Sequence, residues 1–259
     1  MKRLLSIVFS LALGAGILPA QDNADTGVSP DKELSQWEKD FLNLPEDRRN
    51  DFKKHVVKSR ELFNQKRVFE CIEELGKAKA IFPDSPDVEN MLGACQVEFR
   101  AFDNAMTHFN RAIELEPKSA SVLFNIAEIL FVTKEWEDAE KAFEELIVAI
   151  DAEDKEGRQL MMRRLVEFKL LLTKIKLGKM DEAEKMAERY DHLDDSPYPY
   201  YAEAAIAYEN EENLQAEMAM ARAERIFRNP ASIAPWKDTM MEFGYIKSFF
   251  GGDLAEEAE

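Results

Sequence analysis

The chain has 259 residues, of which 46% are hydrophobic and 33% are charged, a mixture typical of a globular protein and not of a disordered one. It contains only 10 glycines and 10 prolines, which favours helices over the turn-rich sandwiches and barrels of β-proteins. Its net charge of −17 opposes binding to nucleic-acid phosphates and to anionic lipids, so neither is expected as a partner.

Residues 1–20 have the pattern of a secretory signal peptide. Lys2 and Arg3 form a basic start, an apolar stretch over residues 4–17 follows, and Ala20 suits the position before cleavage. The apolar stretch is short for a membrane span, and the alternative is a retained anchor. We therefore expect a bacterial-type exported protein, periplasmic or secreted, that is cleaved near Ala20 and has no membrane span afterwards.

A flexible linker over residues 21–29 is expected to lead into N-terminal capping helices over residues 30–51. The first helix should open at Pro30, because proline is favoured in the first turn of a helix. Three apolar residues fall on one face of it: Leu34, Trp37 and Phe41. This segment is predicted to cover the open end of whatever follows.

A period of 34 residues is explicit between residues 52 and 153. Large residues, small residues and prolines each recur at that spacing: Val68, Phe102 and Trp136; Cys71, Ala105 and Ala139; Leu75, Phe109 and Phe143; Pro83 and Pro117. Phe102, Ala105 and Phe109 share one helical face, and Gly93 is small where a second helix would cross it. Each period therefore predicts two antiparallel helices.

These residues resemble the tetratricopeptide-repeat (TPR) family. The family pattern is a Leu-Gly pair, an aromatic residue before a small one, a second aromatic, an alanine and a proline. The unit at 86–119 matches it through Leu92, Gly93, Phe102, Ala105, Phe109, Ala112 and Pro117. The units at 52–85 and 120–153 match in part, with Ser59 in place of glycine and Asp151 in place of proline. The resemblance implies an all-α, right-handed superhelical solenoid of antiparallel helix pairs, with N- and C-terminal capping helices.

The pattern weakens after residue 153. Residues 154–230 are interpreted as an insertion followed by two degenerate TPR units, at about 164–197 and 198–230. Residues 231–259 are expected to form a C-terminal capping helix that opens at Pro235 and then an acidic tail.

The resemblance also implies a concave groove lined by the first helix of each pair. Projected onto this chain, the groove has nine candidate partner-binding residues: Arg60, Phe63, Asn90, Val97, Phe124, Glu128, Phe131, Phe168 and Ile175. In the alternative interpretation several of the aromatic members pack between repeats or under a capping helix.

No sequence pattern points to catalysis, a metal or a cofactor. The three histidines lie in different units, and no nucleophile elbow, phosphate-binding loop or zinc motif occurs. Cys71 and Cys95 could form a disulfide in an oxidising compartment, but buried packing of two small residues is the preferred interpretation.

The function favoured by the sequence is that of an exported adaptor or scaffold of the cell envelope, which binds a partner peptide or protein in its groove. A periplasmic assembly factor or holdase that shields apolar clients is the alternative, and the breadth of captured clients separates the two. An enzyme or a carbohydrate-binding protein is the third hypothesis.

Overall fold

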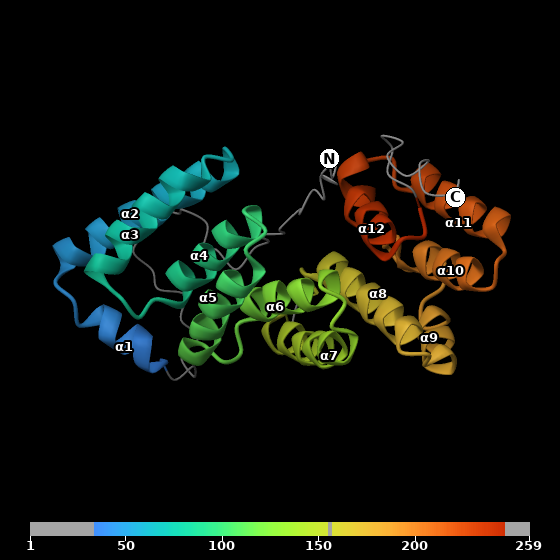
Figure 1. The fold of residues 1–259 in the computed structure, drawn as a ribbon, viewed down its shortest axis with the longest axis horizontal. Helices are drawn as coiled ribbons and strands as arrows, with labels where there is room; N and C mark the ends of the chain where they lie inside the picture. The colour runs from blue at the N-terminus through green and yellow to red at the C-terminus, as the bar shows by residue number, and fades with distance from the viewer. Residues whose placement is uncertain (1–33, 155–156, 247–259) are drawn as a thin grey trace, which may run out of the picture. The chain divides into compact units, whose positions relative to one another are not determined.

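The computed structural model describes residues 34–154 and 157–246, and this part of the chain is all-α (Figure 1). Its twelve helices follow one another as antiparallel pairs, as the repeat pattern predicts. They divide into two compact units, with the boundary after Ile129. The expected signal peptide, linker and acidic tail lie outside the described residues.

The N-terminal unit contains a capping helix, two complete helix pairs and most of a sixth helix. Their bounds are α1 (Gln36–Leu42), α2 (Glu46–Asn64), α3 (Val68–Ile81), α4 (Pro86–Glu98), α5 (Phe102–Leu115) and α6 (Ala120–Val132). Within the unit α2 packs along α3, α4 packs along α5, and α3 contacts α4.

Local sequence signals explain where these helices begin and turn. Ser35 caps α1 in a reciprocal capping box with Glu38, and Ser85 caps α4 immediately before Pro86. α1 begins at Gln36 in the structure, and Pro30, expected to open it, lies outside the described residues.

The turns inside the pairs repeat with the sequence. Lys66 and Arg100, 34 residues apart, both adopt the left-handed conformation, with φ of 59° and 57°. The backbone then reverses within three residues, and the Arg67 amide donates to the Leu62 carbonyl at 2.9 Å. The 34-residue period therefore recurs in these two reversals as well as in the core residues.

Side chains spaced for one helical face form the core of the N-terminal unit. Leu75, Ala105 and Phe109 are fully buried. The Phe109 ring lies so close to α4 that a Cβ atom at Gly93 would be 2.4 Å from its Cε1 atom. The prediction that a small residue is needed at this helix crossing is thus confirmed.

A histidine–glutamate hydrogen bond links the helices of both pairs. His55 Nδ1 lies 2.7 Å from the Glu74 carboxylate, and His108 Nδ1 lies 2.8 Å from that of Glu89. The two bonds occupy equivalent places 34 residues apart, with the histidine and the glutamate exchanged between the helices. Both histidines therefore have a structural partner on the paired helix.

The two cysteines face each other between α3 and α4 as free thiols. Both are fully buried, and the Cys95 thiol donates to the Cys71 sulfur across 3.5 Å. This bond and burial raise the pKa of Cys95 above its usual range. The structure thus favours the packing interpretation of the pair.

Neither cysteine is expected to react with a thiol reagent while the N-terminal unit is folded, because both sulfur atoms are shielded from solvent and the raised pKa of Cys95 disfavours its thiolate. Colour development with Ellman's reagent should show two thiols per chain in denaturant and essentially none without it. Rapid labelling of the folded chain would contradict the burial. Absence of thiols in denaturant would instead reveal a disulfide.

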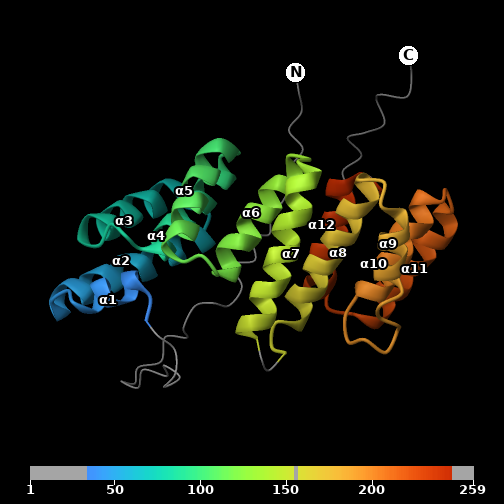
Figure 2. The same ribbon diagram turned by 90° about the horizontal axis from the view of Figure 1, so that it is seen from below.

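The C-terminal unit contains the end of α6 and six further helices. Their bounds are α7 (Trp136–Glu153), α8 (Leu160–Lys176), α9 (Met180–Ala187), α10 (Tyr198–Glu209), α11 (Asn213–Ile226) and α12 (Pro230–Phe243). α7 packs against α8, α10 contacts both α8 and α9, and α11 packs along α10 (Figure 2). α12 returns to lie against α8 and α11.

One helix boundary in this unit differs from the prediction. Pro235, expected to open the last helix, lies inside α12, which begins at Pro230. The Asn229 side chain caps the helix by accepting a hydrogen bond from the Ala231 amide at 3.1 Å. An Asn-Pro pair supplies a side-chain cap as well as the favourable φ, so it overrides the later proline.

Across residues 34–154 and 157–246, every helix is too short or too polar to traverse a lipid bilayer.

Candidate partner-binding surface

Six of the nine candidate groove residues lie in the N-terminal unit, on the first helices of its pairs. Arg60 on α2 is half-buried. The other five are buried: Phe63, Asn90, Val97, Phe124 and Glu128. Their burial shows where the isolated chain places these side chains, and their role in binding a partner stays a prediction.

Arg60 is a candidate with one unsatisfied hydrogen-bond donor. Its Nη2 atom is 3.8 Å from the Asp87 carboxylate, which is a loose ion pair. Its buried Nε–H has no hydrogen-bond partner among the described residues. A buried donor without an acceptor destabilises a folded protein by about 1–3 kcal/mol, so an acceptor oxygen from a partner would be favourable here.

A polar contact joins the first helices α4 and α6. The Asn125 amide donates to the Asn90 side-chain oxygen at 2.8 Å, and both residues are buried. Asn90 is among the predicted groove residues, whereas Asn125 is not. The hydrogen bond between them could not be inferred from spacing, because it depends on how two helices cross.

The other three candidates lie in the C-terminal unit, where α12 covers two of them. The Phe131 ring stacks on Phe243 with 6.4 Å between centroids, and the Phe168 ring is 5.4 Å from Trp236. Ile175 is buried as well. The aromatic candidates in this unit therefore contact the last helix of their own chain.

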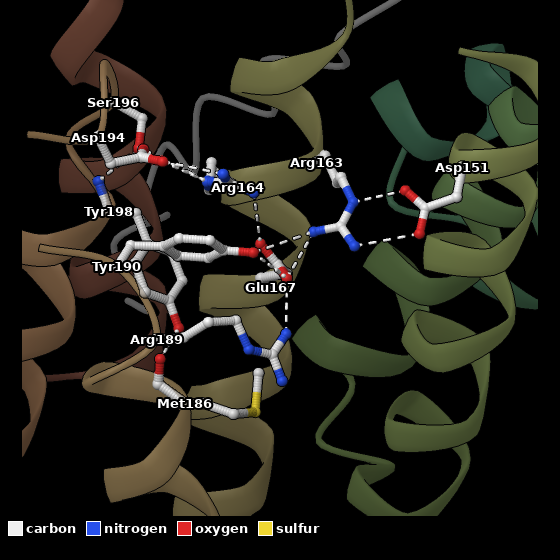
Figure 3. A network of polar contacts seen from close by, with 10 residues as sticks. All are labelled: Asp151, Arg163, Arg164, Glu167, Met186, Arg189, Tyr190, Asp194, Ser196 and Tyr198. Atoms are coloured by element: carbon white, nitrogen blue, oxygen red, sulfur yellow. Dashed lines mark hydrogen bonds and ion pairs between the residues drawn. The ribbon is translucent and has the colours of Figure 1, made fainter. Parts of the chain in front are cut away.

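A buried ion network in the C-terminal unit was not anticipated from the sequence (Figure 3). The Glu167 carboxylate on α8 is fully buried and lies 2.6 Å from Arg163 and 3.2 Å from Arg164. It also accepts hydrogen bonds from Arg189 at 2.8 Å and from the Tyr190 hydroxyl at 3.0 Å. One carboxylate thus binds three guanidinium groups.

The same network fastens the segment between α9 and α10 to α8. Arg164 lies 3.5 Å from the centre of the Tyr190 ring and donates to Asp194 at 2.9 Å. Ser196 donates to the other Asp194 oxygen at 2.5 Å. Arg163 extends the network to Asp151 on α7 at 2.6 Å. The charges of three arginines are therefore balanced by those of three carboxylates within the network. This balance suits a structural role, in which the network holds the segment between α9 and α10 on α8.

The carboxylates at the rim of this network should make the C-terminal unit sensitive to acid. Although burial raises the pKa of Asp194, hydrogen bonds from Arg164 and Ser196 hold it below its ordinary value. Hydrogen bonds from Arg163 likewise lower the pKa of Asp151. A lowered carboxyl pKa stabilises the fold above the unfolded pKa of about 3.9, and this contribution is lost as the pH falls through the folded value.

We expect Asp194→Asn to lower the free energy of unfolding by about 2 kcal/mol at pH 7, since it removes a charged acceptor. The difference from the unchanged chain should shrink as the pH falls below about 4. Urea unfolding at pH 7, 5 and 3 measures both effects. A difference that stays constant over this range would show that the Asp194 charge does not contribute.

A surface pocket of about 390 Å³ lies in the C-terminal unit, lined in part by Lys174, Glu144 and Glu182. Lys174 already donates to Glu140 at 2.7 Å and to Glu182 at 2.8 Å. Its charge is therefore neutralised within the protein. Among the described residues, no group of histidine, cysteine and acidic side chains is arranged to hold a metal ion.

Antiparallel helix pairs whose reversals recur every 34 residues, at Lys66, Arg100 and Lys134, are typical of an α-helical repeat protein. Residues 96–161 match the tetratricopeptide-repeat family model. The resemblance drawn from the 34-residue period is thereby confirmed. The right-handed superhelix that it implies stays a prediction.

Several solved structures are similar to this chain, and the first of them shows the same fold. The structure titled as functional characterization of Pseudomonas aeruginosa pilF has a TM-score of 0.54 and 16% identity, over 76% of this chain and 97% of that one. A thermophilic TPR protein of Thermus thermophilus matches with a TM-score of 0.48 and 13% identity, over 73% and 99% of the two chains. A Thermobaculum terrenum O-GlcNAc transferase mutant matches with a TM-score of 0.43 and 16% identity, over 64% of this chain and 27% of that one. No curated protein sequence matches the chain.

Proposed function

We propose that this protein is an exported interaction scaffold that binds a partner peptide or protein on the first helices of its repeats. Tetratricopeptide repeats generally act in protein–protein interaction, and stacked helix pairs present long surfaces that suit such binding. The basic and apolar pattern of residues 1–20 supports export of the chain, to the periplasm or beyond.

The observation that carries this proposal is the unsatisfied Arg60 Nε–H on α2, within the predicted groove. The Arg60 side chain is partly exposed, so a partner's carboxylate or main-chain carbonyl could bind its guanidinium group. The guanidinium is also the sort of group that dominates interface energies when it is desolvated on binding.

An exposed aromatic pair favours the holdase as a second candidate function. Phe69 on α3 is 75% exposed, and its ring centroid is 5.0 Å from that of Phe99, which is 41% exposed. Two adjoining exposed rings are suited to weak contact with many apolar clients.

Affinity capture from an envelope extract of the source organism tests the adaptor function. The bait is the full chain, compared with Arg60→Glu and with Lys53→Glu as the matched control. Lys53 lies exposed on the same helix, so both variants change the charge equally. Circular dichroism confirms that each variant stays helical.

Capture of one or two proteins by the unchanged chain and by Lys53→Glu, but not by Arg60→Glu, is the expected result. Equal capture by all three baits would refute binding at Arg60. Capture of many proteins, lost in a Phe69→Ser variant, would instead favour the holdase.

A further inference from the structure

The last helix, α12, covers first-helix side chains of the C-terminal unit. The Trp236 ring lies 5.4 Å from that of Phe168 on α8 and 5.7 Å from that of Tyr201 on α10. At the other end of α12, Phe243 stacks on Phe131 and lies 6.2 Å from Trp136. α12 thus contacts residues of the face on which a TPR partner would be expected.

The apolar contacts of α12 follow a simple spacing. Its most buried large side chains are Ile233, Trp236, Met240 and Phe243. The steps of three, four and three residues place them on one side of the helix. An amphipathic helix that docks into a groove presents anchors at this same spacing.

Charged groups on α8 complement α12. Lys169 donates to Glu242 at 3.3 Å, and both side chains are almost completely buried. The Lys176 ammonium lies 4.2 Å from the centre of the Phe243 ring. The face under α12 therefore recognises an acidic residue next to an aromatic anchor.

α12 is a weak helix by its own sequence. Pro235 lies in its interior and has no N–H to donate to the carbonyl four residues earlier. A helix of 14 residues is also too short to be stable alone. Its order therefore depends on the contacts that it makes with α8, α10 and α11, and such elements open at lower free energy than the core of a protein.

We propose that the face formed by Phe131, Phe168 and Tyr201 is a helix-binding groove that α12 occupies within the same chain. A partner's amphipathic helix, with bulky apolar residues spaced like those of α12 and a carboxylate opposite Lys169, binds by displacing it. This inference rests on the proposed interaction function and gives it a ligand class. Because α12 competes, binding to the closed chain is weakened by the fraction of molecules in which it is released.

The first test uses a fluorescent peptide with the sequence of residues 230–246 and the full chain, followed by fluorescence anisotropy. The double variant Trp236→Ala, Phe243→Ala removes the two aromatic anchors of α12 and so frees the groove. It should bind the peptide about tenfold or more tightly than the unchanged chain does. Ala234→Ser, an exposed position on α12, is the matched control and should bind as the unchanged chain does.

A peptide with alanine at both anchor positions should not bind any chain. If the double variant keeps its helical circular dichroism and binds the unaltered peptide no more tightly than the unchanged chain does, the groove assignment is wrong. This outcome leaves the Arg60 capture experiment unaffected, because that experiment concerns the N-terminal unit. The groove under α12 and partner binding at Arg60 can therefore be refuted independently of each other.

A second measurement needs no variant, which matters if the double variant does not fold. Hydrogen–deuterium exchange of the unchanged chain should be faster in α12 than in α8 and α10. Excess peptide should accelerate exchange in α12 further while α8 stays protected. Exchange of the three helices as a single unit, unaffected by the peptide, would overturn the proposal.

Discussion

Glu167→Ala is expected to lower the free energy of unfolding of the C-terminal unit by about 3–5 kcal/mol, because it leaves buried guanidinium groups without their common carboxylate. Arg164 and Arg163 would keep Asp194 and Asp151, respectively, as partners. Arg189 would lose Glu167, the carboxylate with which it pairs in the network. The segment between α9 and α10 should therefore loosen first.

Urea unfolding in a Trp37→Phe background measures this effect. Trp37 is the single tryptophan of the N-terminal unit, so the fluorescence of the remaining two, Trp136 and Trp236, reports on the C-terminal unit. Glu184→Ala on the exposed face of α9 is the control and should change stability by no more than about 0.5 kcal/mol. A loss below about 1 kcal/mol for Glu167→Ala would show that the network does not hold the unit together.

Gly93→Ala should destabilise the N-terminal unit by about 1–3 kcal/mol, although alanine is the better helix former. The added methyl group would lie 2.4 Å from Phe109 Cε1, in a core where Phe109 is fully buried. The ring or the α4 backbone must move, and either movement strains neighbouring contacts. Urea unfolding followed by circular dichroism measures the loss.

Gly76→Ala is the matched control for this steric effect. Gly76 is exposed within α3, and an added Cβ atom would meet nothing within 4 Å. Helix propensity alone then applies, so this variant should gain about 0.5–1 kcal/mol. Combining Gly93→Ala with Phe109→Leu should cost less than the sum of the two single changes, because the smaller side chain relieves the clash. A Gly93→Ala variant as stable as Gly76→Ala would contradict the close crossing.

Much of the fold could be predicted from the sequence because each repeat buries residues of the same size at the same positions, so the pattern occurs several times. The recurrence of Phe109 and Phe143, of small residues such as Ala105, and of the reversals at Lys66 and Arg100 follows from one 34-residue unit. The histidines were correctly placed in separate repeats, but their hydrogen bonds to glutamates were not anticipated. A bond between paired helices depends on side-chain direction, which spacing alone does not give.

The candidate site was predicted less completely than the fold. Periodicity shows that Phe131 and Phe168 are apolar and lie on first helices, but not which segment covers them. The structure places Phe243 and Trp236 of α12 there, 112 and 68 residues further along the chain. Contacts at such separations have no local signature.

The sequence by itself therefore determined the class of protein, the helix pairs and the small residue at Gly93, since these depend on short-range spacing. Only the tertiary structure decided that Glu167 gathers three arginines and that α12 lies over first-helix aromatic residues. A buried charge or a docked helix is stabilised by groups that folding brings together from distant parts of the chain. The local sequence around a residue does not predict these distant partners.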